Sequence, residues 1–232
     1  MKEFGSSTAS LVARRVHASK NRFFEVGDFG SSHSAVARAL SRLVNDGELV
    51  RVRRGLYWRG VKTPLGMSYP SATATLEAIY GKSSGFGPAY LDAANLLGLT
   101  TQIGARPCFA VPYEVDGLAM RLVSRSRRTG RAINRLTAHE VALLEVLGDW
   151  ERVVDMPSMD AITRIASMVG RTIRADAVVG AASTESARVR ERLRLVLRVA
   201  GCTDALDKVA PATNEETRSN ALAGFSASGL AA

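Results

Sequence analysis

The sequence predicts an α+β protein with two domains, and three observations support this class. Residues 36–44 carry apolar side chains at helical spacing, residues 49–58 hold two short β-prone runs, and helix- and strand-like patterns resume beyond residue 70. With 46% hydrophobic residues in a chain of 232, the composition allows one sizeable core or two modest ones. The pause in pattern at residues 63–70 favours two.

Three helix-like patterns open the chain. Residues 8–18 predict a first helix, and residues 22–29 predict an apolar cluster with a short turn-like element. Ser32 or Ser31 can N-cap a third helix, whose apolar positions recur at the spacing of one helix face. Gly47 stands where a left-handed residue commonly ends a helix, so we expect this helix to stop just before it.

A β-hairpin is predicted directly after the third helix. Two β-prone runs, Leu49–Val52 and Leu56–Trp58, are separated by Arg53, Arg54 and Gly55, a composition typical of a turn. Three helices and a hairpin within about 60 residues are typical of a winged helix-turn-helix, whose third helix enters the major groove of DNA. The hairpin is then the wing.

The polar face of the third helix and the arginines of the wing form the predicted DNA-binding surface. Its candidate residues are Ser32, His33, Ser34, Arg38, Ser41, Arg42, Arg51, Arg53, Arg54 and Arg59. Arg38 and Arg42 can reach guanine edges or phosphates, and the sequence does not separate these roles. The wing arginines suit phosphates or a minor groove. The alternative is a winged helix that binds protein and leaves these side chains solvated.

The distribution of charge points to the same end of the chain. The protein has 31 Lys and Arg against 22 Asp and Glu, a net charge of +9 that favours polyanionic partners. Residues 1–60 hold eleven basic and five acidic side chains, an excess of six, so a quarter of the chain carries two thirds of the net charge. Only five of the basic residues are lysines, a skew that a GC-rich genome also produces.

A second basic segment lies at residues 121–135, which hold six arginines and no acid. Four of them are candidates for contacts with the DNA backbone or with an acidic partner: Arg125, Arg127, Arg128 and Arg131. The alternative is a solvated connector before the helix that begins at Thr137. The sequence leaves both open.

The expected organisation has four parts. Residues 1–62 form the winged helix-turn-helix, residues 63–70 a linker with two prolines and a glycine, residues 71–205 a C-terminal α/β domain, and residues 206–232 an Ala- and Ser-rich tail predicted to be disordered.

The C-terminal domain is predicted to contain mainly helices. Helices are expected at residues 71–80, 89–97, 159–169, 173–182 and 186–200, and after a capping box formed by Thr137 and Glu140. Two strands, Cys108–Tyr113 and Leu118–Ser124, are expected to be joined by a hairpin turn.

Several classes of protein are excluded by what the sequence lacks. No apolar run suits a signal peptide or a membrane span. Cys108 and Cys202 are far apart and lack metal-ligand spacing, and two free cysteines are expected in the reducing cytoplasm. Gly81-Lys82-Ser83 lacks the first glycine of a phosphate-binding loop, and no lysine follows an acid at the spacing common in metal-dependent nucleases. We therefore expect no enzyme, no cofactor and no metal.

The run AVARALSRLVNDGELVRVRRGLYWR resembles the N-terminal domain of AbiEi-type antitoxins, which belong to bacterial abortive-infection toxin–antitoxin pairs. The later runs SSGFGPAYLDAANLLGLTTQ and LTAHEVALLEVLGDW are also similar to blocks of that family, so the resemblance covers roughly residues 8–201.

This resemblance implies two activities and a role in phage defence. The winged helix would bind inverted repeats in the promoter of its own operon and repress it, with Ser34, Arg38, Arg42 and the wing arginines at the operator. The C-terminal antitoxin domain would counteract a nucleotidyltransferase-like toxin, directly or indirectly. A one-component regulator with a ligand- or partner-binding C-terminal domain remains the alternative.

Overall fold

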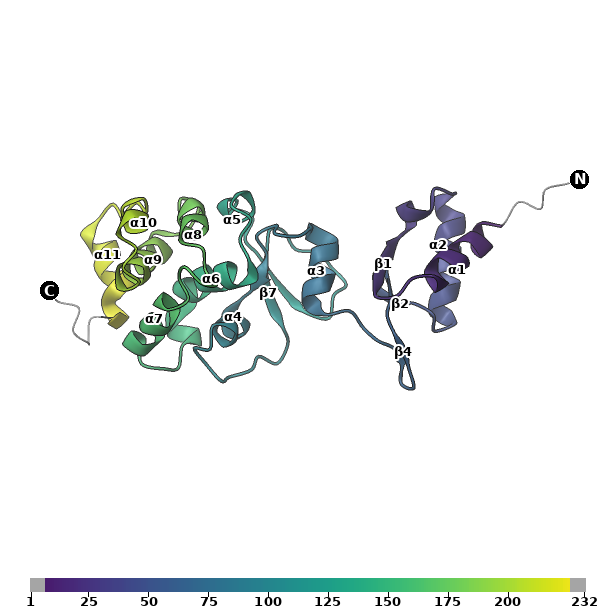
Figure 1. Cartoon of the computed structure of the whole chain (residues 1–232), viewed down its shortest axis with the longest axis horizontal. Coiled ribbons are helices and arrows are strands. Elements are labelled where there is room, and N and C mark those ends of the chain that lie inside the picture. Colours follow the sequence, from purple (N-terminus) through teal and green to yellow (C-terminus); the bar gives the residue numbers. More distant parts are fainter. Residues whose placement is uncertain (1–6, 226–232) are drawn as a thin grey trace, which may run out of the picture. The chain divides into compact units, whose positions relative to one another are not determined.

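The computed structural model describes residues 7–225 of the chain (Figure 1). The chain divides into two compact units. Unit 1 contains the residues up to Ile79 together with Asp116–Leu118, and unit 2 contains Tyr80–Val115 and the residues from Ala119 onward. Helices and strands occur in both units, which confirms the predicted α+β class.

Unit 1 begins with the six elements of a winged helix-turn-helix. They are α1 (Thr8–His17), β1 (Arg22–Glu25), the 3-10 turn η1 (Val26–Phe29), α2 (His33–Asn45), β2 (Val50–Arg53) and β3 (Leu56–Arg59). The apolar sides of α1 and α2 pack on one core, in which Val16, Phe24 and Leu40 are fully buried. The second helix of the motif is thus a single 3-10 turn, as the short apolar cluster predicted.

The three strands of unit 1 form an antiparallel sheet in the order β1-β3-β2. The central strand β3 pairs with β1 through Phe24 and Tyr57, and with β2 through Val50 and Trp58. The turn between β2 and β3 contains Gly55 at φ +84°, so the predicted wing hairpin is confirmed.

The predicted linker is folded at its start. A second hairpin is made by β4 (Lys62–Thr63) and β5 (Gly66–Met67), and the Trp58 indole Nε1 donates a 3.0 Å hydrogen bond to the carbonyl of Ser68. Gly66, at φ +111°, supplies the turn. Pro64 and Gly66, which contributed to the linker prediction, thus lie in the tight turn between β4 and β5.

Unit 1 also contains most of α3 (Ala72–Tyr80), whose last residue belongs to unit 2. The elements of unit 2 are β6 (Gly87–Pro88), α4 (Tyr90–Leu96), β7 (Cys108–Val111), β8 (Arg121–Ser124), α5 (Gly130–Ile133), α6 (Ala138–Val153), α7 (Ser158–Ala166), α8 (Ala175–Ala182), α9 (Ala187–Val199), α10 (Thr203–Asp207), α11 (Glu215–Leu222) and the 3-10 turn η2 (Ala223–Phe225).

Helix α6 is the centre of unit 2. It packs against α4, α8 and α9 (Figure 1). Every residue of Glu140–Leu147 is buried. A helix that is buried on all sides needs charged partners for any acid that it carries. Two acids on α6, Glu140 and Glu145, meet this condition through ion pairs with arginines.

The predicted hairpin between the two strands of unit 2 is wrong. Strands β7 and β8 pair in parallel, with Cys108 opposite Arg121 and Val111 opposite Ser124, and β6 pairs antiparallel to β7 on its other edge. The chain therefore returns along residues 112–120 before β8 begins. Turn-like letters in this stretch mark an irregular connection, which a local pattern does not distinguish from a hairpin turn.

The prediction of a disordered tail is also wrong for residues 206–225. Phe225 is 3% exposed, with its ring 4.8 Å from the Trp150 ring, and the fully buried Arg192 donates to the carbonyl of Ala221 at 2.8 Å. The low hydrophobicity of this segment predicted disorder, because composition alone does not show that single residues such as Phe225 are buried in the core. The rest of the predicted tail, residues 226–232, lies outside the described residues.

Replacement of Asn214 by Ala tests whether α11 is a stable helix. The Asn214 carboxamide oxygen accepts a 2.7 Å hydrogen bond from the backbone N–H of Thr217 and caps this helix. We expect Asn214→Ala to lower the free energy of unfolding by about 1 kcal/mol, measured by urea denaturation. A change near zero would contradict a folded C-terminal segment.

Candidate nucleic-acid interface

Helix α2 presents two opposite faces, and the predicted DNA-binding residues lie on the exposed one. His33, Ser34, Arg38, Ser41 and Arg42 are all exposed. The buried side carries Val36, Ala39, Leu40 and Leu43. Because the apolar side is already used by the core of unit 1, the polar face is free to meet a groove.

The start of α2 leaves backbone donors for a ligand. Ser32 is the N-cap residue, as predicted, but its hydroxyl makes no capping hydrogen bond and instead lies 3.3 Å from the Ser34 hydroxyl. Arg38 Nε donates to the carbonyl of Ser34 at 3.2 Å, which points its guanidinium toward this first turn. N–H groups at a helix start and a guanidinium beside them suit an anion such as a phosphate.

The wing brings further positive charge to unit 1. Arg51 and Arg54 are exposed, and Arg53 is half-buried at the end of β2. Within residues 7–225, none of these three side chains, nor Arg38 or Arg42, has a carboxylate within ion-pair distance. Five arginines on α2 and the wing therefore keep donors for a partner.

Arg59, which the sequence places among the DNA-binding candidates, does not belong to this exposed surface. Its side chain is only 15% exposed, and Nη1 lies 3.2 Å from the Glu48 carboxylate and donates to the Glu48 carbonyl at 3.1 Å. Hydrogen bonding from Lys62, with the charge of Arg59, lowers the pKa of Glu48. Arg59 therefore holds the end of β3 to the segment that follows α2.

The second basic segment is also corrected by the structure. Arg131 is 3% exposed, and it lies 2.7 Å from Glu145 through Nη1 and 2.7 Å from Glu185 through Nε. Arg125 bonds Glu145 at 2.7 Å, and Arg128 lies 3.3 Å from Glu185. These three arginines hold unit 2 together and do not form a free basic patch.

Arg127 is the one candidate of this segment that is exposed, and no described residue forms an ion pair with it. The segment itself contains no acid, and the two partners of Arg131, Glu145 and Glu185, follow 14 and 54 residues later in the chain. Local sequence carries no signal for such pairs.

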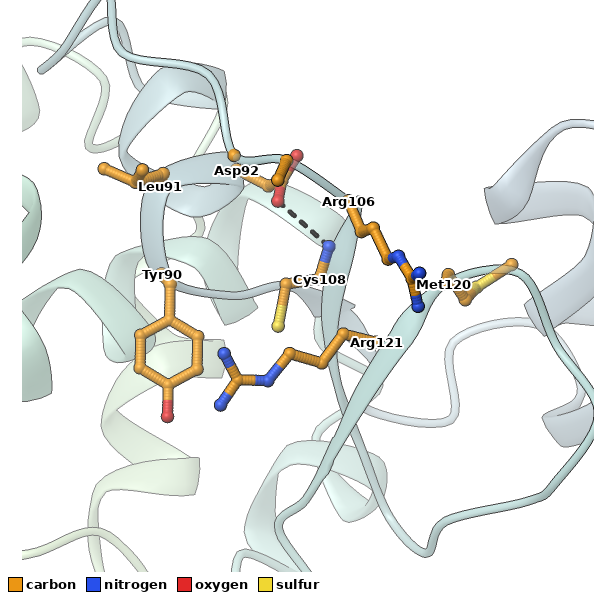
Figure 2. A pocket seen from close by; sticks show the side chains of 9 residues that line it. Tyr90, Leu91, Asp92, Arg106, Cys108, Met120 and Arg121 are labelled. Atoms are coloured by element: carbon orange, nitrogen blue, oxygen red, sulfur yellow. Dashed lines mark hydrogen bonds between the residues drawn. The ribbon is translucent and has the colours of Figure 1, made fainter.

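Sequence reasoning did not single out two further arginines of unit 2 that form no ion pair with a described residue. Arg106 and Arg121 line a cavity of about 500 Å³ with Tyr90, Asp92 and Cys108 (Figure 2). Arg121 belongs to the basic segment, in which nothing distinguishes it from the other five arginines, and Arg106 has no other charged residue near it in the sequence. Both residues line this cavity because the parallel pairing of β7 and β8 brings the starts of these strands to one edge of the sheet, which the sequence did not predict.

Residues 7–225 contain neither a cluster of metal ligands nor a membrane-spanning helix. In this range, no group of three or more His, Cys, Asp or Glu side chains is placed to hold a metal ion. No helix in the same range combines the length and apolar composition needed to cross a bilayer.

The fold and the exposed α2 face of unit 1 define a winged helix-turn-helix protein. Residues 12–58 match the family described as "Transcriptional regulator, AbiEi antitoxin". The resemblance to AbiEi-type antitoxins is thereby confirmed for the N-terminal region, and the match supports a protein of the antitoxin and regulator kind. It covers α2 and the wing and leaves unit 2 outside.

A solved structure is similar along most of the chain. The crystal structure of the Rv2827c protein from Mycobacterium tuberculosis is 14% identical, covers 89% of this chain and 81% of its own, and gives a TM-score of 0.45. No curated protein matches the sequence.

Proposed function

We propose that this protein is an antitoxin that counteracts a nucleotidyltransferase-like toxin and represses its own operon by binding inverted repeats in the promoter. The observation that carries the proposal is that the family match covers a winged helix in which Arg38, Arg42, Arg51, Arg53 and Arg54 form no ion pair with a described residue. Residues 12–58 match the antitoxin regulators, and the same residues include Arg38, Arg42 and the wing.

In the proposed complex, α2 enters the major groove and its first turn faces the bases. Ser34 and Arg38 are candidates for base edges, since recognition helices contact bases near their N-termini. Arg51, Arg53 and Arg54 contact phosphates or an adjacent minor groove. Ser32, His33, Ser41 and Arg42 complete the surface.

We assign the toxin-counteracting role to unit 2, because unit 1 is occupied by DNA in this proposal. Binding and positioning account for both activities, and no chemical step is required of the chain. The protein acts in the cytoplasm, where the promoter and the toxin are both present.

Binding to the upstream region of its own gene tests the repressor role. The purified full-length protein is titrated against that region and against a scrambled duplex, with fluorescence anisotropy read over a series of salt concentrations. We expect a preference of at least ~10³-fold for the upstream region and a salt slope that corresponds to several phosphate contacts. Equal, weak binding to both duplexes would contradict an operator-reading repressor.

Co-expression tests the antitoxin role separately. A neighbouring gene with nucleotidyltransferase motifs is induced alone, with this chain, and with its Arg38→Ala variant. We expect the toxin alone to arrest growth, and both the wild-type chain and Arg38→Ala to restore it. The promoter should stay repressed with the wild-type chain and become active with Arg38→Ala. Failure of the wild-type chain to rescue growth would contradict the proposal.

A second function, a one-component regulator with a ligand-binding C-terminal domain, is favoured by one observation, the cavity beside Arg106 and Arg121. A metabolic operon next to the gene would support this reading over the antitoxin.

A further inference from the structure

The cavity of unit 2 is built by four separate segments. Its walls come from the start of α4, the loop at residues 104–106, the first residue of β7 and the first residue of β8 (Figure 2). Its volume of about 500 Å³ lies in the range of small-molecule sites. Leu91, Cys108 and Met120 supply apolar surface, and the backbone positions of β7 and β8 are fixed by their pairing.

Two guanidinium groups reach this cavity without a carboxylate partner. Arg106 and Arg121 form no ion pair within residues 7–225. Arg121 lies over the Tyr90 ring, with its guanidinium carbon 5.1 Å from the ring centroid, so the aromatic face fixes its position (Figure 2). A cation–π contact does not use the N–H donors, which lie in the plane of the guanidinium and stay available for a ligand.

A second cavity of unit 2 is lined by arginines that have carboxylate partners. A smaller space of about 230 Å³ is lined by Arg125, Arg128 and Arg131. All three are neutralised by Glu145 or Glu185 at 2.7–3.3 Å. The larger cavity is lined by two arginines and a single acid, Asp92, which forms no ion pair with either of them.

Asp92 limits the charge of any ligand. One of its carboxylate oxygens accepts a 2.9 Å hydrogen bond from the backbone N–H of Cys108, so it stays on the cavity wall as a fixed negative charge. The Cys108 thiol adds no second one, because burial raises its pKa. Two positive groups and one negative group leave an excess of one positive charge, which suits a monoanion and disfavours a polyanion.

We propose that this cavity binds a small organic carboxylate with a single negative charge and an apolar body. The carboxylate pairs with the planar donors of Arg121 beside the Tyr90 ring, and Arg106, whose guanidinium lies beside Met120 on the other side of the cavity, adds the second positive charge (Figure 2). The apolar body extends toward Met120, on the side of the cavity opposite Leu91 (Figure 2). This site is not part of the proposed repressor and antitoxin roles, and the experiments below test it independently of them.

A pair of isosteric probes tests the charge requirement. Benzoate and benzamide share the same ring, and only benzoate carries the carboxylate. We expect isothermal titration of the full-length protein to show benzoate binding at least about tenfold tighter than benzamide, since charged hydrogen bonds to arginine are lost with the amide. Equal binding of both would overturn a carboxylate site, and so would inorganic phosphate that competes as well as benzoate.

Variants locate the site within the chain. Arg106→Gln and Arg121→Gln are each expected to weaken benzoate binding about tenfold, and Arg121→Lys, which keeps the charge without the planar donors, is expected to have an intermediate effect. Arg127→Gln removes an exposed charge of the same unit outside the cavity and serves as the matched control. If Arg127→Gln and Arg121→Gln lowered the affinity for benzoate equally, the effect would come from the net charge of the protein and the proposal would be overturned.

A local probe separates binding from folding. The methyl group of Met120, labelled with carbon-13 and assigned with Met120→Leu, lies at the cavity wall, whereas Met67 belongs to unit 1. We expect benzoate to shift the Met120 signal and leave the Met67 signal unchanged. A Met120 signal that does not move at saturating benzoate would place any binding elsewhere and overturn the assignment.

Discussion

Replacement of Arg131 by Ala is expected to lower the free energy of unfolding by about 3–5 kcal/mol, because it leaves two buried carboxylates without their shared cation. Glu145 and Glu185 expose 2% and 1% of their side chains, and Arg131 lies 2.7 Å from each. Arg125 and Arg128 remain at the edge of the group but are themselves a quarter or more exposed. Urea denaturation measures the loss.

The matched control for this prediction is Arg127→Ala, four residues earlier in the same segment. Arg127 is exposed and unpaired among the described residues, so its removal should change stability by less than about 0.5 kcal/mol. If both variants lost similar stability, the loss would come from the segment's charge in general, and the buried network would not be its cause.

The pH dependence of stability should follow the same group. Burial raises the pKa of Glu145, but the hydrogen bond from Arg125 and the charge of Arg131 lower it by more. The pKa of Glu145 in the folded protein is therefore below its ordinary value of 4.5. A carboxyl with a depressed folded pKa adds stability above its unfolded pKa and loses it as pH falls through the folded value.

We therefore expect the stability difference between wild type and Arg131→Ala to be full above about pH 5 and to narrow below pH 4.5. Unfolding by urea at several pH values between about 3 and 7 measures this. A difference that stays constant to the lowest pH would show that Arg131 acts through packing alone.

The winged helix could be predicted because its signals are local. Gly47 and Gly55 have φ of +70° and +84°, so each glycine marks a backbone conformation at its own position. The Thr137–Glu140 capping box of α6 is likewise confirmed, with the Glu140 carboxylate accepting from the Thr137 N–H at 2.8 Å. Such features depend on residues three or four positions apart.

The errors concern contacts between distant residues. Arg131 looked solvated because Glu185 follows 54 residues later, and Arg59 looked exposed because Glu48 approaches from the segment after α2. The parallel pairing of β7 with β8 depends on the path of residues 112–120, which no local pattern encodes. In an arginine-rich chain, charge alone therefore does not separate a binding surface from an internal ion pair.

Arg38→Ala and Arg54→Ala should weaken DNA binding in two different ways, if the proposed interface is right. Arg38 lies in the exposed face of α2 beside the helix start, and we expect its loss to cost about 1–3 kcal/mol at the operator and to relax preference at one base position. Arg54 lies in the turn of the wing, and we expect its loss to weaken all duplexes about equally and to lower the salt slope by about one.

Arg171→Ala is the matched control, because Arg171 is an exposed arginine of unit 2. Titrations against the operator, single-base variants of it and a scrambled duplex, each over a salt series, separate the two effects. Unchanged affinity in both Arg38→Ala and Arg54→Ala would rule out α2 and the wing as the DNA-binding surface. If Arg38→Ala instead lowered the salt slope without changing base preference, Arg38 would be a phosphate contact, and sequence reading would have to come from the rest of the α2 face, where Ser34 and Arg42 are the next candidates.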